Sequence, residues 1–176
     1  DASIDDFKLI NDSLNFKILN LSTKEISGLN IRDLSADLII SSTSMEANHA
    51  IINVNESELD VDFRMKYNNY KSLSYFIDSV DMYGDIRSTT INISDIGHFS
   101  DILFQMPNEV VVSGEMRGKV NNLSTKDIMI KYGKTTMLSG DISFKGLPDF
   151  FSSLILAENI IISTNTGDIK SFYLPI

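Results

Sequence analysis

The segment SELDVDFRMKY, residues 57–67, decides the predicted fold class. Apolar side chains occupy every second position, at Leu59, Val61, Phe63, Met65 and Tyr67. Charged side chains stand between them, at Glu58, Asp60, Asp62, Arg64 and Lys66. Because successive side chains of a β-strand point to opposite faces of a sheet, this period of two predicts a strand with one dry and one wet face.

The same alternation recurs along the chain. In EVVVSGEMRGKV, residues 109–120, the apolar side holds Val110, Val112, Met116 and Val120, together with Gly114 and Gly118. Shorter alternating runs are Leu14, Phe16 and Ile18; Leu34, Ala36, Leu38 and Ile40; Val80, Met82 and Ile86; Ile128, Ile130 and Tyr132; and Leu138, Ile142 and Phe144. One-sided amphipathic strands in series are typical of antiparallel sheets, because strands of parallel sheets are apolar on both faces. The sequence therefore predicts an all-β, antiparallel protein.

Helical spacing of apolar residues is confined to short segments. NYKSLSYFIDSV (residues 69–80) and SDIGHFSDILF (residues 94–104) each predict two or three turns at most. A third turn is expected at GLPDFF, residues 146–151, where Pro148 suits a first helical position. We expect these helices to cap an edge or an end of the sheet.

The pentapeptide NLSTK occurs twice, at residues 20–24 and 122–126, each time followed by an acidic residue and an isoleucine. Both copies follow a predicted strand, so we expect them to form turns. A looser copy, RDLSADLII at residues 32–40, adds to the impression of repetition. The sequence predicts a single repetitive β segment with loose repeats at about residues 14–110 and 110–176, excised from a longer protein.

Composition and charge exclude several classes of function. The 24 acidic and 15 basic residues give a net charge of -9, which repels a nucleic-acid backbone. The absence of cysteine rules out disulfides, thiolate metal sites and cysteine nucleophiles. The longest apolar stretch, SSLILAENIIIS at residues 152–163, is interrupted by Glu158 and Asn159 and falls short of the ~20 residues that span a bilayer.

Catalytic and metal-binding interpretations have little support. His49 and His98, the only histidines, are predicted to lie in different loops or turns and have no partner at ligand spacing. The acids of residues 58–62 share one strand face and could bind calcium or act as a glycosidase pair, but Arg64 and Lys66 continue that face. We interpret it as a solvated exterior. The sequence predicts no enzyme, no metal site and no cofactor.

The run from residue 110 to residue 169 resembles the middle repeats of TamB proteins of the Bacteroidetes type, members of the AsmA-like family. The shared elements are Ser113-Gly114, Arg117-Gly118, Asn122-Leu123, the segment from Thr136 to Gly140 and the turn from Gly146 to Asp149. The resemblance covers the chain from Met65 to Ile176, about two thirds of its length.

The resemblance implies a periplasmic protein whose elongated sheet is curved into a U-shaped apolar groove, sometimes called a taco. Such a groove carries phospholipid acyl chains between the inner and outer membranes and supports outer-membrane biogenesis, with a possible partner of the BamA barrel class. The full-length protein would be anchored to the inner membrane outside this sequence, and neighbouring repeats would meet at the sheet edges. The expected groove residues are Leu59, Val61, Phe63, Met65, Val80, Met82, Ile86, Val110, Val112, Met116, Ile128, Ile130, Leu138, Ile142 and Phe144.

The alternation alone leaves a second arrangement open. The apolar faces could close on each other as a β-sandwich core, which is the commoner result of this pattern. Such a sandwich would be an adhesion or scaffolding module that binds proteins or sugars at its loops or edges, without lipid cargo. The family resemblance favours the open groove.

Overall fold

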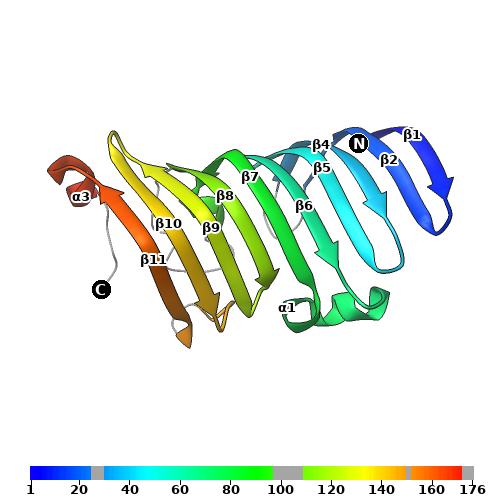
Figure 1. Ribbon diagram of the computed structural model, residues 1–176. Helices are drawn as coiled ribbons and strands as arrows, with labels where there is room; N and C mark the ends of the chain where they lie inside the picture. The colour runs from blue at the N-terminus through cyan, green and yellow to red at the C-terminus, as the bar shows by residue number, and fades with distance from the viewer. Residues whose placement is uncertain (25–29, 97–108, 150–151, 172–176) are drawn as a thin grey trace.

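The computed structural model describes residues 1–24, 30–96, 109–149 and 152–171, and these form one antiparallel sheet (Figure 1). The strands are β1 (Ala2–Ile10), β2 (Ser13–Leu21), β3 (Thr23–Lys24), β4 (Asn30–Ile40), β5 (Ser44–Val54), β6 (Ser57–Lys66), β7 (Asp81–Asn92), β8 (Glu109–Lys119), β9 (Asn122–Tyr132), β10 (Thr136–Lys145) and β11 (Leu154–Ser163). The short helices are the 3-10 helix η1 (Tyr70–Tyr75), α1 (Phe76–Ser79), α2 (Ile93–Ile96) and α3 (Thr166–Ser171).

The strands lie side by side in chain order, from β1 at one end of the molecule to β11 at the other (Figure 1). The short β3 pairs with β4 beside this path. The sheet is curved and does not close, because β1 and β11 each pair with a single neighbour among the described strands. This confirms the predicted open antiparallel sheet. The alternative of a closed β-sandwich is wrong, because the described residues form one sheet and no second layer.

Strands that the sequence did not predict carry β-bulges. On β5 the register shifts between Ala47 and Ala50, and on β11 it shifts between Glu158 and Ile161. A bulge places extra residues in one strand, so the apolar positions before and after it fall out of phase. The alternation is therefore hidden in β5 and β11, and β1 is shifted in the same way between Asp5 and Lys8.

The helices agree in part with the prediction. η1 and α1 occupy residues 70–79, and the side chain of Asn69 caps η1 by accepting a hydrogen bond from the Lys71 backbone N–H at 3.0 Å. Of the second predicted segment, α2 covers the start, and the part from residue 97 lies outside the described residues. Residues 146–149 form a turn without helix, and residues 150 and 151 are not among those described.

The predicted position of the NLSTK repeat is wrong for the second copy, whereas the first copy lies, as predicted, where one strand ends and the next begins. The second copy forms the first half of β9, and the turn precedes it at residues 120 and 121. The first copy ends β2 and continues into β3. Leu123 and Thr125 lie on the face of Ile128 and Ile130, but the bulge at Asp127 puts them out of phase with that run, so the alternation did not reveal this half of the strand.

The bulges on β5, β7, β9 and β11 lie in a band across the middle of the sheet. His49, Asp127 and Asn159 have φ values of 52°, 51° and 55° there. His49 therefore lies in a strand and not in the predicted loop, whereas His98 lies outside the described residues. Because a bulge bends its strand and strengthens the local twist, this band accounts for the curvature of the sheet.

Two carboxylates hold these bulges in the same way. Asp62 Oδ1 accepts a hydrogen bond from the His49 backbone N–H at 2.5 Å, and Asp141 Oδ1 accepts one from the Asp127 N–H at 2.9 Å. These backbone bonds lower the pKa of both carboxyl groups. The strands β4–β7 and β8–β11 are thus two four-stranded units with equivalent bulges, although the NLSTK copies do not occupy equivalent places in them.

Candidate functional site: the apolar face

One face of the sheet carries an uninterrupted row of uncharged, mostly apolar positions across ten strands. Residues directly opposite each other on neighbouring strands share a face. From β1 to β11 the row is Leu9, Leu14, Ile40, Met45, Met65, Met82, Gly118, Leu123, Phe144 and Ile155. We call this the long row.

A second row lies next to the long row on the same face. It consists of Phe16, Leu38, Ala47, Phe63, Gly84, Met116, Thr125, Ile142 and Ala157. Shorter rows beyond the bulges are Ala50, Val61, Ile86 and Gly114; Leu34, Ile52 and Leu59; Val112, Ile130, Leu138 and Ile162; Ile128 with Gly140; and Ile91, Val110, Tyr132 and Thr136. Together with the long row they define the apolar face, which contains no charged side chain.

The apolar face includes every predicted groove residue except Val80. Val80 precedes β7 and ends α1, where its backbone N–H donates to the Phe76 carbonyl at 3.2 Å. Its side chain is fully buried, so it anchors the helix instead of lining the strand face. Val80 has the same parity as Met82 and Ile86 but precedes the strand, so the period of two could not show that its side chain is buried.

The apolar face is half-buried, unlike the core of a two-layered protein. Among the predicted groove residues on it, Ile128 is buried and the others are half-buried. At the ends of the sheet the exposure rises to 70% for Leu9 and 59% for Ile162. A contiguous exposed apolar surface of this kind is rare on monomeric soluble proteins and marks an interaction site.

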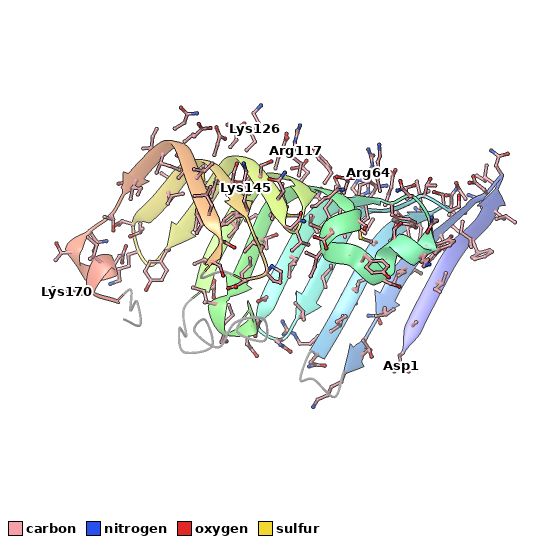
Figure 2. The ribbon with its side chains drawn as sticks, turned by 90° about the horizontal axis from the view of Figure 1, so that it is seen from below. Asp1, Arg64, Arg117, Lys126, Lys145 and Lys170 are labelled. Atoms are coloured by element: carbon pink, nitrogen blue, oxygen red, sulfur yellow. The ribbon has the colours of Figure 1, made fainter. Side chains whose placement is uncertain are left out.

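The opposite face carries the charged side chains of the sheet, interspersed with exposed apolar ones such as Ile51, Met137 and Ile161. Arg64 pairs with Glu46 at 3.0 Å, and Arg87 bridges Asp60 and Asp62 at 2.5 and 2.7 Å. Figure 2 shows Arg64, Arg117, Lys126 and Lys145 on this side of the ribbon. Asp60 and Asp62 of β6 are therefore used in surface ion pairs, which fits the predicted solvated exterior.

The floor of the apolar face is adaptable over β7 and β8. A Cβ atom built on Gly84 would lie 3.1 Å from Met116 Cε and 3.7 Å from Phe63 Cδ2, so these two side chains lie over the glycine. Met65 and Met82 stand opposite each other beside them in the long row. Methionine is flexible and fills irregular spaces, so this stretch can fit chains of varying shape.

At the β11 end, α3 lies over one rim of the apolar face and forms one wall of an open pocket of about 530 Å³. Its lining residues are Val110, Ile130, Tyr132, Thr136, Leu138, Ile162, Thr164, Asp168 and Ile169. Sequence reasoning did not find this pocket, because α3 follows the last strand and its position depends on contacts with a distant hairpin.

Asp168 of α3 fixes the helix to the turn between β9 and β10. Its carboxylate accepts hydrogen bonds from the backbone N–H groups of Lys134, Thr135 and Thr136 at 3.1, 2.9 and 3.0 Å. The Thr136 hydroxyl and the Asn165 amide donate to it as well, at 3.0 and 2.8 Å. These donors, the Thr135 N–H foremost, lower the pKa of Asp168 to about 2.

Asp95 of α2 makes the equivalent contact in the other unit. Its Oδ2 accepts hydrogen bonds from the Glu56 N–H at 3.0 Å and from the Ser57 hydroxyl at 2.7 Å, at the turn between β5 and β6. A helix after the fourth strand of each unit is thus tied by an aspartate to a hairpin turn on the same rim.

We expect the docking of α3 to be lost in acid. The folded-state pKa of about 2 lies below the ordinary value of ~3.9 for aspartate, so the contact stabilises the fold above about pH 4 and is lost as the pH falls towards 2. In NMR spectra the amide signals of residues 134–136 should titrate with a midpoint near pH 2. They should lose this titration in Asp168→Asn, and a midpoint near pH 4 in the unaltered protein would contradict the contact.

The described residues offer no metal centre, since no three of their His, Cys, Asp or Glu side chains are grouped to hold an ion. None of the helices in the described ranges is long and apolar enough to cross a membrane. Comparisons with models of protein families, with curated protein sequences and with solved structures found no match to this chain.

Proposed function

We propose that this chain is a segment of an envelope-spanning periplasmic protein, and that its apolar face carries phospholipid acyl chains between the inner and outer membranes. The observation that carries the proposal is the long row, which crosses ten strands without a charge. Nine strand spacings of ~4.8 Å make an apolar path of roughly 43 Å. Such a path is long enough to hold more than one lipid in series.

The chemistry of the path suits acyl chains. Removing apolar surface from water contributes roughly 25 cal/mol per Å², so a chain lying on the half-buried face is stabilised without a specific polar contact. The row contains aliphatic and methionine side chains and few rings, which imposes little shape selection along its length. An adhesion module of the sandwich type is the weaker proposal, because its premise of a closed double sheet is wrong.

The wider setting belongs to the same proposal. Among the strands that the structure describes, β1 and β11 have no neighbour on their outer edges, which are suited to continuing the sheet into neighbouring repeats of a longer protein. Support of outer-membrane biogenesis, with a barrel partner of the BamA class, and an inner-membrane anchor are parts of this proposal that come from the family resemblance.

Photocrosslinking from the two faces tests the proposal. A photoreactive phenylalanine analogue at Met45, Met82 or Leu123 of the long row should form adducts with phospholipid. The matched controls are the next residues of the same strands, Glu46, Tyr83 and Ser124, which form a row on the charged face. We expect adducts at the first three positions only; lipid adducts at none of them, or equally on both faces, would overturn the proposal.

A further inference from the structure

Two pockets on opposite faces of the sheet meet at the turn between β9 and β10. The pocket under α3 lies on the apolar face. A second pocket of about 670 Å³ lies on the charged face and at the turn, lined by Glu109, Val111, Lys131, Tyr132, Gly133, Lys134, Thr135, Thr136 and Met137. Both pockets share Tyr132 and Thr136, so only the rim of the hairpin separates them.

The pocket under α3 offers no charge to a ligand, although Asp168 lines it. The carboxylate of Asp168 is directed at the turn, where backbone and side-chain donors occupy its oxygens. The remaining lining is dominated by aliphatic side chains, of which Ile162 and Ile169 are each 59% exposed. The pocket volume of about 530 Å³ is within the usual range for small-molecule sites and suits part of one acyl chain.

The second pocket combines charged side chains with apolar ones, Val111 and Met137 among them. Lys131, Lys134 and Glu109 line it, and the Asp168 carboxylate lies against the backbone of the same turn, so the two lysines are balanced by two acids. Neither lysine forms an ion pair with any residue that the structure describes. Two exposed lysines without an ion-pair partner among the described residues therefore lie directly across the rim from an apolar pocket.

From this arrangement we infer that the β9–β10 rim is a binding site for one anionic phospholipid, with an acyl chain under α3 and the headgroup at Lys131 and Lys134. The inference rests on the proposed function, from which it takes the ligand class, and it adds headgroup selection at a defined place. A lipid held in this way straddles the rim, so the site is where a lipid enters or leaves the apolar face.

The test uses phosphatidylglycerol and phosphatidylcholine in detergent micelles, each with a diazirine near the methyl end of one acyl chain. After illumination, phosphatidylglycerol should label peptides that contain Leu138, Ile162 or Ile169 several-fold more than phosphatidylcholine does. Lys131→Gln and Lys134→Gln should each reduce this preference about fivefold, the factor that corresponds to about 1 kcal/mol per cation at a lipid headgroup. Glu109→Gln should increase it.

The controls show whether a change in labelling comes from loss of folding or from the change in net charge. Lys66 and Lys145 are the last residues of β6 and β10, on the rim opposite the β9–β10 turn. We expect Lys66→Gln and Lys145→Gln to leave the lipid preference unchanged. Leu138→Trp should fill the pocket and remove the labelling there while the thermal midpoint changes little. Labelling that persists in Leu138→Trp, or a preference that is indifferent to Lys131 and Lys134, would overturn the inference.

Failure of the site and failure of the proposed function give different patterns. If peptides with Met65 and Met82 are labelled but those around Leu138 and Ile169 are not, the rim site is wrong and the conduit stands. If only the rim is labelled, the site stands and the conduit fails. If neither region is labelled, both are wrong.

Discussion

Replacing Phe63 or Met116 with aspartate should leave the sheet folded and reduce acyl-chain crosslinking on the apolar face at least tenfold. Both side chains lie over Gly84, so either carboxylate would stand in the middle of the apolar path. A tenfold loss corresponds to about 1.4 kcal/mol, and burying a polar group against a lipid chain costs about 1–3 kcal/mol. Without lipid the same carboxylate stays hydrated on an open face, so the thermal midpoint should fall only modestly.

The control is Arg117→Ala on the charged face. Arg117 pairs with Glu115 in an exposed position, so its replacement should change stability by no more than about 0.5 kcal/mol. Asp62 is unsuitable as a control because it holds the bulge at His49. If the Phe63 and Met116 variants unfold outright, the apolar face is a closed core. If they fold and bind lipid normally, the assignment of these two residues to the lipid-binding face is wrong.

Gly118→Ala should destabilise the protein by about 3 kcal/mol, which is a large part of a typical domain's stability. A Cβ atom at this position would lie 2.3 Å from the Asn122 backbone oxygen, and Gly118 has a φ of 116°, which side-chain-bearing residues rarely adopt. The clash is with backbone, so the start of the β8–β9 hairpin must move. Urea denaturation monitored by circular dichroism measures the loss.

Gly84→Ala is the matched control, because Gly84 lies on the same face and its nearest atom is the flexible Met116 Cε at 3.1 Å. We expect it to cost less than about 1 kcal/mol. An equal loss for both variants would mean that general packing, and not the backbone of Gly118, sets the effect.

The fold class could be predicted from particular strands. In β6 and β8 one side of the strand is uncharged along its whole length, because neither strand contains a bulge. The period of two therefore revealed both the strands and their apolar faces. β5 and β11 could not be found in this way, because the residues added at His49 and Asn159 shift the phase of the alternation. The alternation also could not decide between an open groove and a closed sandwich, because both folds are built from strands with one apolar face.

The candidate site, too, could be predicted only on the strands that the alternation revealed. The long row contains Met65 and Met82, which the alternation identified, but also Met45 and Leu9 on strands that it missed. The carboxylate contacts of Asp95 and Asp168 join residues more than thirty positions apart, so local pattern cannot show them. A usable signal was the recurrence of an Asp-Ile pair after a strand, at residues 95–96 and 168–169.

The central claim, that the open apolar face carries phospholipid, is tested most directly by native mass spectrometry of the unaltered protein after gentle purification from a Gram-negative host. We expect phospholipid masses bound to the chain, with more than one lipid per molecule, because the path of roughly 43 Å matches the thickness of a whole bilayer, which is two lipids. Repeated recovery of lipid-free protein, under conditions in which a known lipid carrier retains its cargo, would contradict it.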